Sequence, residues 1–304
     1  MKSSPHFLFS TNSPVGDVGN KMIAMKKVLA LAAIASLLFS CSEKPDIDKL
    51  DSDRIPLNIS VRIDWGRDGK DFLAGDEIGI YVVNYNASYP DVLKSKGNQA
   101  DNVRFIYDGS DWNTNEEIFL KDDTSAACYA YYPYTSSIAS PTEYPFSVQK
   151  DQSIKDNYDA SNFLWRKDGI VVSREAYILT KSPLSRLQIV LQPGNGFTED
   201  TWNAASKSVC ILGVKISATI DLSTGIATAT DNIGEVIPLA TSEDKFEAIM
   251  IPQVVADNSK LIVINIDGID YIYHSGAKFD EGGIAHSFVL TINKTDNTVE
   301  GWFV

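Results

Sequence analysis

Apolar and polar residues alternate in many short segments of this chain. The clearest is Ile55–Trp65, "IPLNISVRIDW", where the apolar side chains are Ile55, Leu57, Ile59, Val61, Ile63 and Trp65. A period of two residues is typical of a strand with one buried face. Because Pro56 has no N–H to donate to a ladder, we expect this strand to lie at the edge of a sheet or to begin there.

Similar apolar runs, separated by turn residues, predict the other strands. These are Glu77–Val83, Val103–Asp108, Glu117–Leu120, Ser125–Tyr134, Tyr177–Thr180, Ser185–Gln192, Ser208–Leu222, Gly225–Thr230, Lys245–Ile251, Lys260–Ile266, Asp270–His274 and His286–Asn293. Asp267-Gly268 predicts a two-residue hairpin, since both central positions favour positive φ. Thr198–Ser208 is the one segment that favours a short helix, with Thr198 as its N-cap.

Many short strands with turn signals are typical of β-sandwiches or barrels. For a chain of 304 residues we therefore expect an all-β fold of two tandem β-sandwich domains with few short helices. Residues 55–182 would form the N-terminal sandwich domain, and residues 183–304 the C-terminal one. The predicted boundary is the stretch Lys181–Leu184, which contains Pro183.

The beginning of the chain has the layout of a secretory signal. Lys26 and Lys27 precede the apolar run Val28–Phe39, which is too short to span a bilayer. We expect translation to start at Met22 or Met25, so residues 1–40 comprise an upstream extension and a signal peptide.

A cysteine ends this apolar run. Leu38, Phe39, Ser40 and Cys41 resemble the lipobox of bacterial lipoproteins. The resemblance implies cleavage between Ser40 and Cys41, acylation of the Cys41 thiol (palmitate) and localisation to the outer membrane. The alternative is an ordinary signal peptide with a chance cysteine. Residues 41–54 then form an acidic tether, which is either a surface-sorting signal or a soluble spacer.

The charge balance excludes one class of partner. Residues 1–40 contain four lysines and one aspartate, so the remaining chain has 23 basic and 39 acidic side chains, a formal net charge of −16. Such a chain repels phosphates and anionic lipids, so we expect no nucleic-acid partner and membrane contact only through the lipid anchor. Cys128 and Cys210 are expected to be two separate buried thiols rather than a disulfide.

No catalytic motif accompanies these strands. The sequence has no nucleophile elbow, P-loop, GxGxxG or zinc-spaced Cys/His set, so we predict no enzyme activity, no cofactor and no metal. His274 and His286 are expected to be ordinary residues at strand ends.

Several short stretches occur together in one order. They are Gly75–Val83, Tyr131–Tyr134, Asp151–Ser153, Asn162–Trp165, Leu184–Thr198, Asp221–Gly225, Ile251–Gln253 and Thr291–Trp302. This order resembles the fimbrillin family, the lipoprotein precursors of outer-membrane type V pili. The resemblance implies two transthyretin-like sandwiches. This chain departs from the family pattern at Lys181, Ser182 and Pro183, a region where members often have a histidine.

The resemblance also implies an assembly mechanism. In polymerising members a trypsin-like protease cuts after a basic residue near the first strand, that strand leaves, and a terminal strand of another subunit replaces it. Ile55–Trp65 is the candidate exchanged strand. Arg54 is the leading cleavage candidate, ahead of Arg67 and of Arg62, which lies inside the strand. The alternative is a permanent edge strand.

The position in the fimbrium follows from the last strands. We expect His286–Asn293 to belong to the chain's own sheet, which leaves only Thr298–Val304 as a short donor. This favours a tip or accessory subunit that serves adhesion, with other fimbrial subunits and surface ligands as partners. The alternative is a glycan-binding outer-membrane lipoprotein that uses Trp112 or the tyrosines of Tyr129–Tyr134, although core roles are favoured for these aromatic residues.

Overall fold

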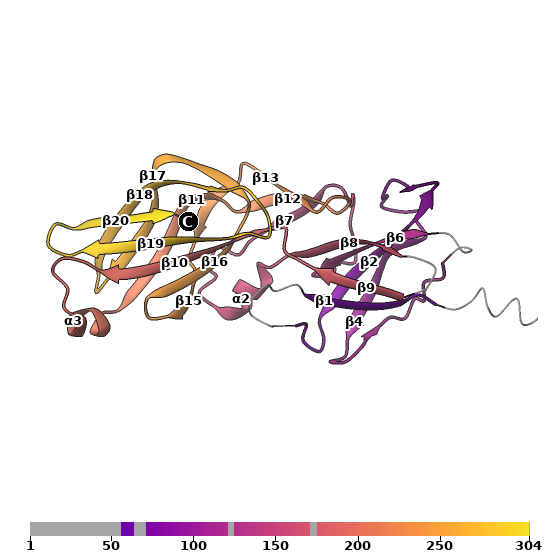
Figure 1. Ribbon diagram of the computed structural model, residues 1–304, viewed down its shortest axis with the longest axis horizontal. Coiled ribbons are helices and arrows are strands. Elements are labelled where there is room, and N and C mark those ends of the chain that lie inside the picture. The colour runs from indigo at the N-terminus through magenta and orange to yellow at the C-terminus, as the bar shows by residue number, and fades with distance from the viewer. Residues whose placement is uncertain (1–55, 64–70, 121–124, 171–174, 304) are drawn as a thin grey trace, which may run out of the picture. The chain divides into compact units, whose positions relative to one another are not determined.

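The computed structural model describes residues 56–63, 71–120, 125–170 and 175–303. This part of the chain is built from strands, with two short helices, α2 (Lys155–Ala160) and α3 (Glu199–Ala204) (Figure 1). The all-β prediction is therefore confirmed. Thr198 caps α3 as expected, since its side chain accepts a hydrogen bond from the N–H of Thr201.

The first nine strands form most of three sheets. They are β1 (Asn58–Ile63), β2 (Glu77–Asn86), β3 (Tyr89–Pro90), β4 (Ala100–Tyr107), β5 (Trp112–Asn113), β6 (Ala126–Tyr132), β7 (Tyr144–Ser147), β8 (Leu164–Ile170) and β9 (Glu175–Thr180). The main sheet has the order β5-β4-β2-β6-β8, with β3 also on β2, while β1 and β9 form a separate pair. Ile80 of β2 lies in one buried cluster and Tyr81 in another, so both faces of this sheet are covered.

The remaining strands form two further sheets and complete a third. They are β10 (Ser185–Pro193), β11 (Lys207–Lys215), β12 (Ser217–Asp221), β13 (Ile226–Ala229), β14 (Ile233–Val236), β15 (Leu239–Ser242), β16 (Lys245–Met250), β17 (Gln253–Ile266), β18 (Ile269–Phe279), β19 (Ala285–Asn293) and β20 (Thr298–Phe303). The sheet orders are β15-β16-β10-β19-β20 and β14-β11-β17-β18. Asp267 and Gly268, with φ of 51° and 87°, form the predicted two-residue turn between β17 and β18.

One predicted strand is two strands in the structure. The segment predicted as Ser208–Leu222 divides at Ile216, whose N–H donates to the carbonyl of Asn232. β11 pairs with β14 and β17, whereas β12 pairs with β13 and β7. The single-strand prediction was wrong because apolar periodicity continues through a change of partner strands.

The β7–β12 pairing joins residues from both sides of the predicted boundary at 182/183 (Figure 1). Next to it, the indole of Trp165 donates to the carbonyl of Leu222 at 2.8 Å. A Cβ on Gly225, which has φ of 74°, would lie 2.1 Å from the Trp165 ring. The two-domain division remains a prediction, but these contacts connect the two parts closely.

Another predicted strand, Glu117–Leu120, is not a strand in the structure. Ile118 and Leu120 are buried, so the apolar pattern did indicate burial. The N–H of Leu57 donates to the carbonyl of Ile118 at 2.7 Å. The prediction was wrong because burial alone does not supply a strand partner over the length of the segment.

Gln152 is a buried side chain that holds backbone groups far along the chain. Its Nε2 donates to the carbonyls of Gln149 and Ile249, and its Oε1 accepts the Ile249 N–H at 2.8 Å. Gln152 has no exposed surface. Since a buried polar group without a partner is costly, this amide stabilises the contact between the loop before α2 and β16.

Gln152→Ala is therefore expected to destabilise the protein. It leaves the N–H and carbonyl of Ile249 without this partner, at a cost of about 1–3 kcal/mol for each group. We expect the melting temperature to fall by roughly 5–15 °C, measured by calorimetry. Gln149→Ala is the control, because that side chain is exposed. Equal melting temperatures for the two variants would contradict the role of Gln152.

Candidate functional site: the first strand and its groove

β1 shows the alternating burial that its sequence predicts. It pairs with β9 in parallel, with Ser60 opposite Tyr177. Leu57, Ile59 and Val61 are 5%, 8% and 3% exposed, and they belong to the cluster that covers one face of the main sheet. The four apolar residues Leu57, Ile59, Val61 and Ile63 of the candidate exchanged strand thus lie on or next to that core.

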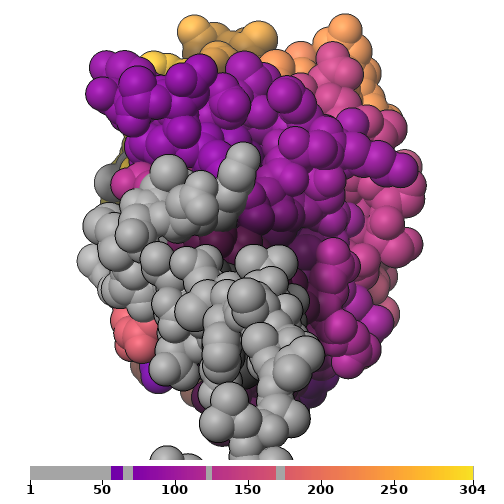
Figure 2. Space-filling view, turned by 90° about the vertical axis from the view of Figure 1, so that its right-hand side faces the viewer, coloured from indigo at the N-terminus to yellow at the C-terminus, as the bar shows by residue number. Residues whose placement is uncertain are grey.

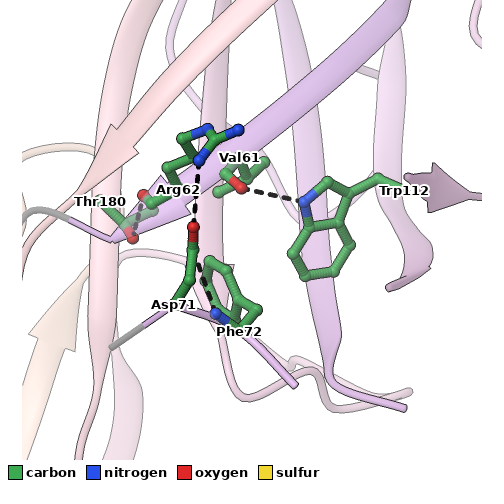
Figure 3. A network of polar contacts seen from close by, with 6 residues as sticks. All are labelled: Val61, Arg62, Asp71, Phe72, Trp112 and Thr180. Carbon is green, nitrogen blue, oxygen red and sulfur yellow. Dashed lines mark hydrogen bonds and ion pairs between the residues drawn. The ribbon is translucent and has the colours of Figure 1, made fainter. Parts of the chain in front are cut away.

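β9 is the only strand that pairs with β1 among the described residues. Two backbone carbonyls of β1 accept hydrogen bonds from side chains elsewhere in the chain, as Figure 3 shows. The indole Nε1 of Trp112 donates to the carbonyl of Val61 at 3.0 Å, and the Thr180 hydroxyl donates to the carbonyl of Arg62 at 3.0 Å. β1 is therefore an edge strand, in agreement with the expectation from Pro56.

The guanidinium of Arg62 lies on the surface of this strand. Its Nη1 is 3.3 Å from Asp71 Oδ2, and Asp71 Oδ1 accepts the N–H of Phe72. Both charged side chains are largely exposed, so the ion pair contributes little to stability. Because Arg62 lies within the β1–β9 ladder, a protease would reach its peptide bond only after local opening.

A cavity of about 460 Å³ runs beside β1. Its lining includes Pro56, Leu57, Asn58, Ile59, Ser60, Phe105, Trp112, Ile118, Ala176 and Tyr177. The lining also contains the polar residues Asp111, Asn113, Thr114, Glu117 and Glu175, so the space is a groove open to solvent along the edge of the buried cluster.

The other predicted site residues lie outside the described residues. They are Ser40, Cys41, Arg54, Ile55, Trp65 and Arg67. Lipidation, signal cleavage and proteolytic processing at these positions remain predictions. In Figure 2, which views the right-hand end of Figure 1, the coloured surface comes mainly from the purple-to-pink segments of the chain.

Sequence reasoning missed three residues that hold β1. Trp112 and Thr180 donate hydrogen bonds to β1, and the carbonyl of Ile118 accepts one from Leu57, the residue just before β1. Trp112 is 51 residues from its partner Val61 along the chain, and Thr180 is 118 residues from its partner Arg62. Periodicity reports which side of a strand is buried, and it carries no information on such distant partners.

The aromatic residues proposed for sugar stacking are mostly in the core. Tyr129 and Tyr131 are buried, and the Tyr131 hydroxyl donates to Asn102 Oδ1 at 2.7 Å. The ring of Trp112 packs edge-on against Phe72, with centroids 4.9 Å apart. The core role that we favoured is confirmed for Tyr129 and Tyr131, whereas Trp112, Tyr132 and Tyr134 are half-buried.

The histidines and cysteines in the described part of the chain lie apart from one another. His286 stacks on Phe303, with ring centroids 5.2 Å apart, and burial lowers the pKa of its imidazole. His274 lies on β18 with an exposed side chain. Cys128 and Cys210 are free thiols, and burial raises the pKa of both. Within the described ranges no group of His, Cys, Asp and Glu is placed to hold a metal ion.

The last strand already has a partner in the same chain. β20 pairs with β19, and Trp302 lies opposite Val289. The Tyr273 hydroxyl donates to the carbonyl of Gly301 at 3.1 Å. β19 itself lies between β10 and β20, which confirms that the segment His286–Asn293 belongs to the chain's own sheet. None of the helices in the described ranges has the length and apolar character that a membrane crossing needs.

These features define an all-β protein of stacked sheets with a strand near its N-terminus held at an edge. The model of the fimbrillin-like family matches residues 67–302. Since this is more than half of the chain, the protein belongs to the fimbrillin-like family, as its sequence motifs indicated. Membership of a fimbrial family indicates a cell-surface or fimbrial location and interaction with other fimbrial subunits.

Solved structures from Bacteroides share the fold. A candidate cell adhesion protein of Bacteroides ovatus ATCC 8483 is 15% identical, with a TM-score of 0.65 over 82% of this chain and 96% of that one. One from Bacteroides uniformis ATCC 8492 is 20% identical, with a TM-score of 0.58 over 81% and 96%. At these identities the likeness establishes the fold alone. A search of curated proteins found no match.

Proposed function

We propose that this protein is a fimbrial subunit in a tip or accessory position, which assembles with its neighbours by exchange of β1 and serves adhesion. One observation carries the proposal. β1 is a short edge strand with alternating burial, paired with β9 alone among the described strands and lying beside an open groove of about 460 Å³. A strand of similar pattern could satisfy the same backbone groups and fill the same positions.

The energetics require a trigger for this exchange. Leu57, Ile59 and Val61 are buried, and each contributes about 1.5–3 kcal/mol through burial. Together they hold β1 by roughly 5–9 kcal/mol before entropy is counted. The strand will not leave spontaneously, so its release needs either proteolysis on both sides or displacement by an incoming strand.

The tip or accessory position is supported by the state of β20. A main-shaft subunit has to offer a terminal strand to its neighbour, whereas β20 is paired with β19 and contacts Tyr273. In this proposal the protein accepts a strand at the β1 groove and does not supply β20. Cys41 would anchor the precursor in the outer membrane through its lipid, with the acidic tether before β1. The role proposed here is non-catalytic.

Intact-mass and N-terminal analysis of the protein isolated from cells tests the proposal. We expect either a diacylated and N-acylated Cys41 terminus on the precursor or a new terminus after Arg54 or Arg67 in assembled fimbriae. Assembled fimbriae in which every copy retains Cys41 and the intact segment to Arg67 would argue against exchange of β1 through proteolysis.

A further inference from the structure

One row of side chains crosses the outer face of the sheet β15-β16-β10-β19-β20. Val190 lies opposite Val289, and Val289 lies opposite Trp302. Residues opposite each other on neighbouring strands share a face. Since such strands are about 4.8 Å apart, the row spans roughly 10 Å. β10, β19 and β20 lie side by side (Figure 1).

Trp302 is open to solvent in this row. Its side chain is 55% exposed, while Phe288 and Leu290 on the other face of the same sheet are fully buried. The neighbouring Phe303 and Val299 of β20 pack against that core. The fold thus uses alternate residues of β20 for the core and leaves the largest side chain of the strand outside.

Polar side chains border the row on both sides. The next row toward one end of the strands contains Gln192, Thr291 and Glu300. Toward the other end, Gln188 lies opposite Ser287. Within the described part of the chain, the side chains of Gln192, Ser287, Thr291 and Glu300 make no hydrogen bond or ion pair. Their donors and acceptors are therefore available around the exposed indole.

We propose that this face binds a neutral glycan, with a pyranose ring stacked on Trp302. A pyranose presents an apolar C–H face and a rim of hydroxyls, which match an aromatic ring bordered by amide and hydroxyl groups. Lys245 lies opposite Val190 at the β16 end of this row, whereas Glu300 is two residues from Trp302 on the same strand. Glu300 and the formal net charge of −13 disfavour anionic sugars at Trp302. A protein partner usually needs about 800 Å² on each side with an apolar centre, whereas this face offers only Val190, Val289 and Trp302.

A glycan site on this face would supply the adhesive part of the proposed function, and the proposal rests on that part. It does not depend on strand exchange at β1. The test is binding of the full chain to immobilised neutral oligosaccharides of glucose, galactose and mannose, three to six sugars long, in both anomeric linkages. Heparin and polysialic acid serve as anionic probes. We expect binding to one or more neutral glycans and none to the anionic probes.

Trp302→Ala should weaken this binding by about tenfold or more, as truncation of a central aromatic contact does. Ile233→Ala is the matched control, because Ile233 is 64% exposed and lies on β14 of another sheet. Thermal melting confirms that both variants are folded. Absence of neutral-glycan binding by the wild type, or unchanged binding by Trp302→Ala, would overturn the proposal. A change in oligomeric state without glycan binding would also overturn it, since the face would then be a protein interface. Strand exchange at β1 is measured separately and is unaffected by either result.

Discussion

Val61→Asp is expected to lower the melting temperature by roughly 8–15 °C, because it places an unpaired carboxylate where only 3% of the side chain is exposed. This cost is about 3–5 kcal/mol, and together with the lost burial of Val61 it offsets most of the roughly 5–9 kcal/mol with which the buried side chains hold β1. Ser60→Asp is the matched control. Ser60 precedes Val61 and faces the other side of the strand, where it is half-buried and lines the groove. Calorimetry of the two variants measures the difference.

The same variant allows complementation in trans. A peptide with the sequence of residues 55–65 should bind Val61→Asp, whose groove is vacated, and raise its melting temperature as the peptide concentration rises. The wild type, with β1 in place, should show no such shift. If Val61→Asp binds no peptide, or if Ser60→Asp responds to the same extent, the groove is not a strand acceptor.

Cys41→Ala is expected to release the protein from the outer membrane or to stall its export. Each buried CH₂ of an acyl chain contributes about 0.8 kcal/mol to membrane affinity, and stable anchoring takes two signals. Loss of the only acylated thiol therefore removes the anchor. Fractionation of cells, with detection in soluble and membrane fractions, measures the change.

Cys210→Ala is the control for this substitution, because Cys210 is a free and partly exposed thiol within the folded region. It should fractionate with the outer membrane as the wild type does. Membrane association of Cys41→Ala at the wild-type level would contradict the anchor prediction.

Local periodicity predicted most strands of this fold because every second residue of these strands is apolar and faces the core. β1 and β10 are examples, with Ile59 and Val61 buried in one and Leu187 and Ile189 in the other. Local signals also predicted the Asp267-Gly268 turn and the Thr198 cap, since both depend on neighbouring backbone groups alone. The ordered motifs then indicated the family.

What the sequence did not show depends on distant partners. The parallel pairing of β1 with β9 joins Asn58 to Glu175, and no local pattern specifies it. The same holds for the backbone contacts of Gln152 and for the change of sheet at Ile216. The sequence also did not show which aromatic residues are exposed. Tyr131 is buried and Trp302 is exposed to solvent, although both lie in strand-like runs. Exposure depends on which other elements cover each face of a sheet.

The most direct test of strand exchange is digestion of the purified precursor, without lipid, by a trypsin-like protease under native conditions. Because the free peptide of residues 55–65 contains Arg62, the protease is inhibited before this peptide is added in isotope-labelled form. Intact mass and oligomeric state are followed before and after the addition. The account predicts cleavage after Arg54 or Arg67 and, once the segment up to Arg67 is cut, replacement of β1 by the labelled strand. Cleavage after Arg54 alone should leave β1 in place, with no assembly. If every site from Arg54 to Arg67 resists, and the protein stays monomeric and takes up no peptide, exchange through β1 is contradicted and a glycan-binding surface lipoprotein becomes the better account.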